Sequence, residues 1–103
     1  MVRNVNIQAV QEEQNLAITY RRLFRGGKGA VKEAGKDVIS DLCYFSKSMM
    51  SAFSTDPLEL ARNEGRREVF YRIITLLEMD HSELLKIIDE QNRKAISEIE
   101  DVY

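Results

Sequence analysis

The chain has 103 residues, of which 44% are apolar and 31% charged, with one proline and no tryptophan. This length predicts a single domain with a modest core, and so little proline is typical of a mostly helical chain. The net charge of −2 is unlike the strongly basic footprint of a dedicated nucleic-acid binder.

Charge is unevenly distributed along the chain. Residues 1–77 carry 12 Lys/Arg and 9 Asp/Glu, whereas residues 78–103 carry 3 and 8. A basic body with an acidic tail suits self-association or an electrostatic partner, and equally the ordinary charge preferences of helix ends. The N-terminus lacks the apolar segment of a secretory signal, and no apolar run is long enough to span a bilayer, so we expect no membrane partner.

The first predicted helix spans about residues 5–24. Val10, Ala17, Tyr20 and Phe24 recur at spacings of three, four and seven residues, as one face of a helix requires. The polar middle of this helix is expected to face solvent in a monomer or another chain in an oligomer.

A basic, glycine-rich segment follows. Gly26, Gly27 and Gly29 predict that the helix breaks here and that residues 25–34 form a mobile loop. A phosphate-binding loop needs Gly-Lys followed by Ser or Thr, and Lys28 is followed instead by glycine and alanine. A solvated loop is the simplest interpretation, and contact with an anion, with nucleic acid or with an acidic protein surface is the alternative. The residues that would make this contact are Arg21, Arg22, Arg25, Lys28 and Lys32.

The second predicted helix spans about residues 36–53 and has a broad apolar arc, which suggests that it is covered on more than one side. The arc consists of Val38, Ile39, Leu42, Cys43, Phe45, Met49, Met50 and Phe53. Core packing is the simpler interpretation, because methionine commonly fills irregular gaps. The alternative interpretation is an interface with a partner. It would use Phe45, Met49, Met50 and Phe53. Cys43, the only cysteine, is expected to be buried and cannot form an intramolecular disulfide.

Two start signals mark the third and fourth predicted helices. Asp56 is an expected N-cap, followed by Pro57 at the first helical position and Glu59 in a capping box. Asp80 and Glu83 repeat the capping pattern, and the fourth helix is expected to reach about residue 99 along a stripe of apolar residues. The stripe consists of Leu84, Ile88, Gln91, Ala95 and Ile99, supplemented by Leu85, Ile87 and Ile96. About three residues join these helices, which predicts an antiparallel hairpin or a sharp corner. With no strand candidate, the sequence predicts one all-α domain of about four helices over residues 1–103.

Gly65 interrupts the third helix at a cost of about 1 kcal/mol relative to alanine. It shares a predicted face with Ala61, and small residues four apart let another helix approach closely, so we expect the second helix to pack there. The rest of that face is Leu58, Val69, Ile73 and Leu76.

The two arginines after Gly65 are predicted to point in different directions. Arg66 borders the expected buried face and is expected to pair with Asp37 or Asp41, while Arg67 is expected in solvent. An ordinary surface position for Arg66 is the alternative.

The chain offers little for catalysis. One histidine, His81, and one cysteine cannot supply the usual ligands of a metal site, and no nucleophile, base and orienting group occur together. We therefore expect a non-enzyme that needs no cofactor and no metal.

Three segments carry a resemblance to a known family. They are YRRLF at residues 20–24, GKDVISDL at residues 35–42 and FSTDPLELARNEGRREVFYRIITLL at residues 53–77. Together they resemble a family of small tailed-bacteriophage proteins, known mainly from the virion gene block of short-tailed phages. The motif Asn63-Glu64-Gly65-Arg66-Arg67 is the most specific part of the match, which covers roughly residues 20–79. Residues 26–34 look like an insertion relative to the family pattern.

The resemblance implies a phage protein in the virion, and in the host cytoplasm before assembly. Its expected partners are further copies of itself or a larger virion protein such as portal or capsid, most naturally at the head–tail connector and otherwise inside the head. Two alternatives are a DNA-binding packaging or regulatory protein, like a small terminase subunit, and a host-directed interaction protein.

Overall fold

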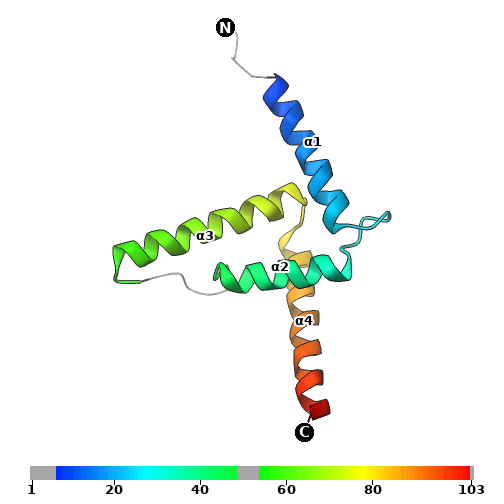
Figure 1. The fold of residues 1–103 in the computed structure, drawn as a ribbon, viewed down its shortest axis with the longest axis vertical. Coiled ribbons are helices and arrows are strands. Elements are labelled where there is room, and N and C mark those ends of the chain that lie inside the picture. Colours follow the sequence, from blue (N-terminus) through cyan, green and yellow to red (C-terminus); the bar gives the residue numbers. More distant parts are fainter. Residues whose placement is uncertain (1–6, 49–53, 103) are drawn as a thin grey trace.

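The computed structural model describes residues 7–48 and 54–102, which contain four helices and no strand. The helices are α1 (Ile7–Phe24), α2 (Glu33–Phe45), α3 (Pro57–Leu76) and α4 (His81–Val102). Figure 1 shows α2 at the centre of the molecule, where the other helices meet. The prediction of a small all-α domain is confirmed.

The core is small and lies where the helices cross. α2 packs against α1, α3 and α4, and α1 also packs against α3. The buried apolar side chains are Val31, Ile39, Cys43, Phe70, Leu76, Leu77, Met79, Leu84, Ile87 and Ile88. The expected burial of Cys43 is confirmed, because none of its surface is exposed. On the rim of the core, Lys36 on α2 pairs with Glu90 on α4 at 2.9 Å.

The helices α1 and α4 extend far beyond this core, toward opposite ends of the molecule (Figure 1). The radius of gyration is 17.2 Å and the molecule measures 67 × 45 × 18 Å. A compact domain of this length would have a radius of gyration of about 13 Å. The projecting parts carry exposed apolar side chains, namely Ile7, Val10 and Ile18 on α1 and Ile96 and Ile99 on α4.

α3 and α4 meet at a corner and do not pack along each other in the described part of the chain (Figure 1). Of the two arrangements expected for this connection, Figure 1 therefore shows the corner. Both N-caps are present: Asp56 accepts a bond from the Leu58 amide at 2.9 Å, and Asp80 accepts one from the Glu83 amide at 2.8 Å. The reciprocal capping-box bond is replaced at α3 by Ser54, whose hydroxyl accepts from the Asp56 amide and donates to Glu59.

α2 runs from Glu33 to Phe45, so the predicted span of residues 36–53 was wrong at both ends. It ends in a Schellman motif, in which the Lys47 amide donates to the Tyr44 carbonyl and the Ser48 amide to the Cys43 carbonyl. Lys47 takes the left-handed conformation usually given to glycine, with φ of 56°. No glycine marks this end in the sequence, which is why the prediction ran past it. Met49, Met50 and Phe53 lie outside the described residues.

The predicted register of α3 was wrong. A β-carbon on Gly65 would meet no atom within 4 Å, so no helix packs over it. Leu58 is 78% exposed and Val69 64% exposed, whereas the buried residues of α3 include Asn63 and Phe70. The predicted face is therefore exposed over most of α3, and only its last two residues match the prediction, since Leu76 is buried and Ile73 packs against the core.

The close approach expected at Gly65 occurs instead at Gly35, near the start of α2. A β-carbon on Gly35 would lie 3.0 Å from the carbonyl oxygen of Phe24 and 3.3 Å from Cγ1 of Val31. The glycine therefore lets α2 begin directly against the end of α1.

Candidate functional site

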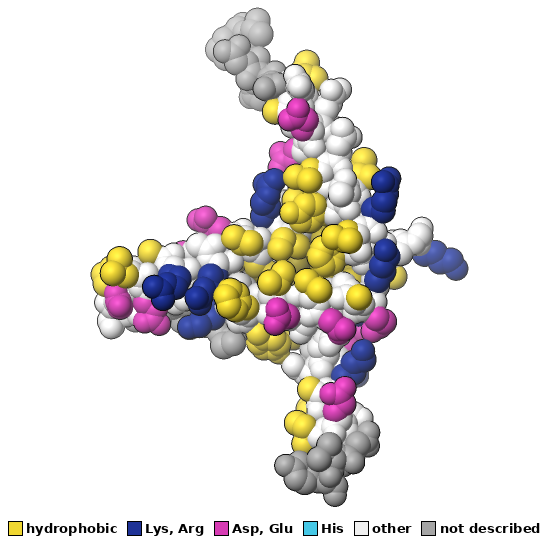
Figure 2. Space-filling model, viewed as in Figure 1, with side chains coloured by type: hydrophobic (Ala, Val, Ile, Leu, Met, Phe, Trp, Pro, Cys, Tyr) yellow, Lys and Arg dark blue, Asp and Glu magenta, His cyan; other side chains and the backbone are white. Residues whose placement is uncertain are grey.

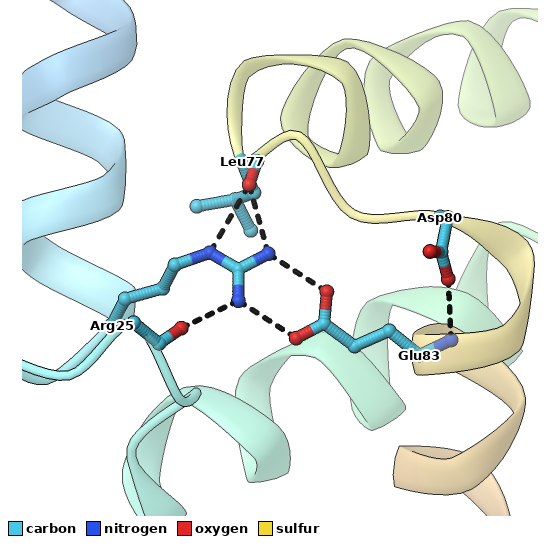
Figure 3. Close-up of polar contacts among 5 residues, drawn as sticks. Arg25, Leu77, Asp80 and Glu83 are labelled. Carbon is cyan, nitrogen blue, oxygen red and sulfur yellow. Dashed lines mark hydrogen bonds and ion pairs between the residues drawn. The ribbon is translucent and has the colours of Figure 1, made fainter.

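Arg25 is the centre of a polar cluster that joins the end of α1 to the corner between α3 and α4 (Figure 3). Its Nη1 and Nη2 donate to the two carboxylate oxygens of Glu83 at 2.7 and 2.8 Å. Its Nε and Nη2 donate to the carbonyl of Leu77 at 3.1 and 2.9 Å, and Nη1 also donates to the carbonyl of Gly29 at 2.8 Å. A guanidinium has five N–H donors, and all five are used within the chain. We call these four residues the Arg25 clamp.

The Arg25 clamp is partly shielded from water, which strengthens it relative to an open surface pair. The side chain of Arg25 is 13% exposed and that of Glu83 34%. The hydrogen bonds from Arg25 hold the pKa of Glu83 below its usual range, and the same bonds raise the pKa of Arg25. Leu77 is the C-cap of α3, and carbonyls at the end of a helix have no hydrogen-bond donor within the helix. The clamp therefore also supplies a donor to one of these carbonyls.

Residues 25–32 form a hydrogen-bonded turn, and α2 already begins at Glu33, inside the segment 25–34 that was expected to be a mobile loop. The Gly26 amide donates to the Ala30 carbonyl at 2.7 Å, and the Lys32 amide donates to the Phe24 carbonyl at 2.8 Å. Gly29 has a φ of 88°, which a residue with a side chain rarely adopts. The turn presents its carbonyl at Gly29 to the guanidinium of Arg25.

The basic residues proposed as anion or nucleic-acid contacts do not act as one group. Arg25 has no donor left for a phosphate, which removes it from the set. Arg21 pairs with Glu78 at 2.7 Å, and Lys32 donates to the carbonyl of Arg22 at 3.1 Å. Arg22 and Lys28 are exposed.

Both arginines after Gly65 are half-buried, as expected for Arg66 but not for Arg67. Arg66 does not pair with Asp37 or Asp41; its guanidinium lies 4.8 Å from the ring centre of Phe45, in a cation–π contact. Arg67, expected in solvent, donates from Nη2 to the carbonyl of Lys47 at 2.8 Å and so supports the end of α2. The register error in α3 explains both differences.

An apolar cleft opens between α2 and α3, with a volume of about 160 Å³. It is lined by Leu42, Phe45, Ser46, Arg66, Val69, Phe70 and Ile73. Phe45, one of the residues predicted at an interface, is 61% exposed at its edge. Figure 2 shows basic side chains over α3 beside hydrophobic side chains near the crossing of the helices.

Groups suited to catalysis are not assembled in the described residues. No three His, Cys, Asp or Glu side chains there are placed to hold a metal ion. His81 is exposed in the first turn of α4, and burial raises the pKa of the Cys43 thiol, which makes that thiol a poor nucleophile. Among the described helices none has both the length and the apolar character needed to cross a bilayer.

Two features of the site were missed from the sequence. Glu83 was interpreted only as part of a helix cap, although it also binds Arg25 58 residues away. The cleft was missed because the side chains on its α3 side were assigned to the core. A weak signal for the Arg25 clamp was available, since arginine directly after a helix end and glutamate in a first turn are both common partners of helix termini.

Comparison with protein families gives one match. The model of the Bbp19-like phage protein family matches residues 20–89, which include Arg25, the Asn-Glu-Gly-Arg-Arg motif and Glu83. Comparisons with curated proteins and with solved structures gave no match. Because the family model covers more than half of the chain, this protein belongs to the Bbp19-like phage protein family.

Proposed function

We propose that this protein is a non-enzymatic structural component of the phage virion that assembles through its helices, at the head–tail connector. The phage family supports the origin. The assembly role rests on the shape of the molecule and on the side chains that it leaves exposed.

The observation that carries this proposal is the pair of projecting helices. Ile7 at the start of α1 is 70% exposed, and Ile96 and Ile99 on α4 are 56% and 58% exposed. Isolated helices are marginal in water, and most of their stability in proteins comes from packing of an apolar face. Helices that project with apolar side chains uncovered are therefore suited to packing against other chains (Figure 2).

The Arg25 clamp supports this role by setting the direction of the two helices. It joins the end of α1 to the corner from which α4 departs (Figure 3). Five hydrogen bonds to three acceptor groups leave the two helix ends little freedom to turn relative to each other. A component that places its binding faces at a fixed angle can assemble in a repeating geometry.

The DNA-binding alternative has less support. Arg25 is committed within the chain and Arg21 is paired with Glu78, which leaves few basic side chains of the turn available for phosphates. If DNA were the ligand, affinity would fall with salt by about 0.9 in log K per log salt for each phosphate neutralised.

Quantitative mass spectrometry of purified phage particles tests the proposal. We expect the protein at a low, fixed copy number relative to the major capsid protein. Particles made without the gene are expected to be defective in joining heads to tails. Absence from particles would contradict the proposal and favour a host-directed role, and a steep salt dependence of DNA binding would favour a packaging role.

A further inference from the structure

The apolar cleft between α2 and α3 is open at the surface of the described structure. Its volume of about 160 Å³ resembles that of apolar cavities of about 150 Å³ that accept a benzene-sized guest. Phe45 and Val69 stand at its edges with 61% and 64% of their surface exposed. It can therefore receive one or two aliphatic side chains from outside.

The rim of the cleft carries one basic residue, Arg66. Arg66 lies over Phe45 and pairs with no carboxylate in the described part of the chain. The neighbouring hollow, which shares Arg66, also contains Arg62 and Lys47. The hollow also contains two carboxylates, Asp56 and Glu59, so its charged side chains are three basic and two acidic. An occupant with carboxylates beside its apolar side chains would complement this rim.

The end of α4 combines exposed apolar side chains with carboxylates. Ile96 and Ile99 are three residues apart, lie on one side of the helix and are both largely exposed. Three of the four residues at positions 98–101 are acidic. The start of α1 is less well matched, because it has only two carboxylates, Glu12 and Glu13, and Glu13 lies 4.0 Å from Arg72 of its own chain.

The end of α4 cannot reach the cleft of its own chain in this fold. α4 leaves the corner after α3 and runs away from it (Figure 1), and the two helices do not pack together in the described residues. We infer that the end of α4 of one copy, with Ile96 and Ile99, inserts into the α2–α3 cleft of a second copy, where Arg66 faces its carboxylates. This inference rests on the proposed function and names the contact through which the copies assemble.

Such a contact joins two different surfaces. Each added copy leaves one free α4 end and one free cleft, so the assembly closes into a ring or continues as a filament. A contact between two identical surfaces would stop at two copies.

Mixing two complementary variants tests this geometry. One variant, I96D/I99D, has a defective α4 end, and the other, Val69→Asp, has a defective cleft. All three positions are exposed in the single chain, so the variants are expected to fold, which circular dichroism checks. Each variant alone should associate at least about tenfold more weakly than the unchanged protein in sedimentation velocity. I96D/I99D removes the apolar side chains that would enter the cleft, and Val69→Asp places a carboxylate at the cleft edge, where it repels the acidic end of α4. Their equimolar mixture should form a species of two copies and no larger one.

A matched control separates this contact from general apolar association. Leu23→Asp changes a side chain that is 70% exposed and lies outside both surfaces, so it should leave association unchanged. Self-association of Val69→Asp equal to that of the unchanged protein would overturn the inference, as would a mixture that remains monomeric. A chain that is monomeric at every concentration, yet present in particles, would overturn the inference and leave the virion role standing. If the protein associates through the predicted contact but is absent from particles, the inference stands and the virion role is contradicted.

Discussion

Gly35 and Gly65 both lie inside helices, yet only Gly35 has neighbours where a β-carbon would stand. Gly35→Ala should destabilise the protein by about 1–3 kcal/mol, because the new methyl group would press on the backbone of Phe24. Gly65→Ala should instead raise stability by up to about 1 kcal/mol, the difference in helix propensity. Urea denaturation with m-values compared measures both changes. Equal gains for the two substitutions would show that the start of α2 can move away from Phe24 freely.

Glu83 gives the Arg25 clamp a pH dependence. The pKa of Glu83 is lowered in the folded chain. The contribution of ionised Glu83 to the free energy of unfolding is therefore fully present above the pKa of an unfolded glutamate. It is lost as the pH falls through the lower pKa of the folded state. Glu83→Gln should therefore cost about 1.5–3 kcal/mol at neutral pH and flatten the acid limb of stability.

Glu78→Gln is the matched control for Glu83→Gln, because it removes the exposed pair with Arg21, in which Glu78 is 71% exposed, and a charge near Arg25 without removing a hydrogen bond of the Arg25 clamp. Its effect should be much smaller and should leave the acid limb unchanged. Denaturant unfolding from acid to neutral pH compares the two variants. An acid limb that is the same in Glu83→Gln as in the unchanged protein would contradict this account of the clamp.

At the scale of the elements, α2 and α3 both end in a Schellman motif with a left-handed residue that is not glycine. Lys47 and Glu78 have φ of 56° and 52°, and each follows the C-cap of its helix in a Schellman motif. Lys47→Gly should raise stability by about 1 kcal/mol, since glycine adopts this conformation without a steric cost. The bond from Arg67 is retained because it uses the backbone carbonyl of Lys47.

Glu78→Gly tests the second Schellman motif, at a position whose side chain also forms an ion pair. It should gain less than Lys47→Gly, because it also removes the ion pair with Arg21. Thermal unfolding of both variants gives the comparison. A loss of stability in Lys47→Gly would mean that its side chain contributes more than its strained backbone costs.

At the scale of the whole molecule, the far half of α4 contributes little to the single chain. Residues 92–99 are exposed, and their contacts with the body include a bond from the Tyr44 hydroxyl to Asn92 and a pair between Lys94 and Glu33. A chain ending at Gln91 should keep cooperative unfolding at low concentration, with a free energy of unfolding within about 1 kcal/mol of the full chain.

The same truncation should abolish any rise of Tm with protein concentration, because such a rise reports association of folded chains. Calorimetry across a range of concentrations separates the two effects. A large loss of stability at low concentration would show that the end of α4 belongs to the core of its own chain.

The sequence by itself determined the features that depend on neighbouring residues. The N-caps Asp56 and Asp80 were identified because each bonds an amide two or three residues ahead. The number of helices and the burial of Cys43 were also readable, since they follow from local propensity and apolar pattern. The resemblance to a phage family was readable over residues 20–79, which lie within the residues 20–89 that the family model matches. Only the tertiary structure decided that Gly35 and not Gly65 is closely approached, and that Arg25 binds Glu83 58 residues away. These contacts depend on the angles at which helices cross, and a periodic pattern shows which residues share a face without showing which face meets a neighbour.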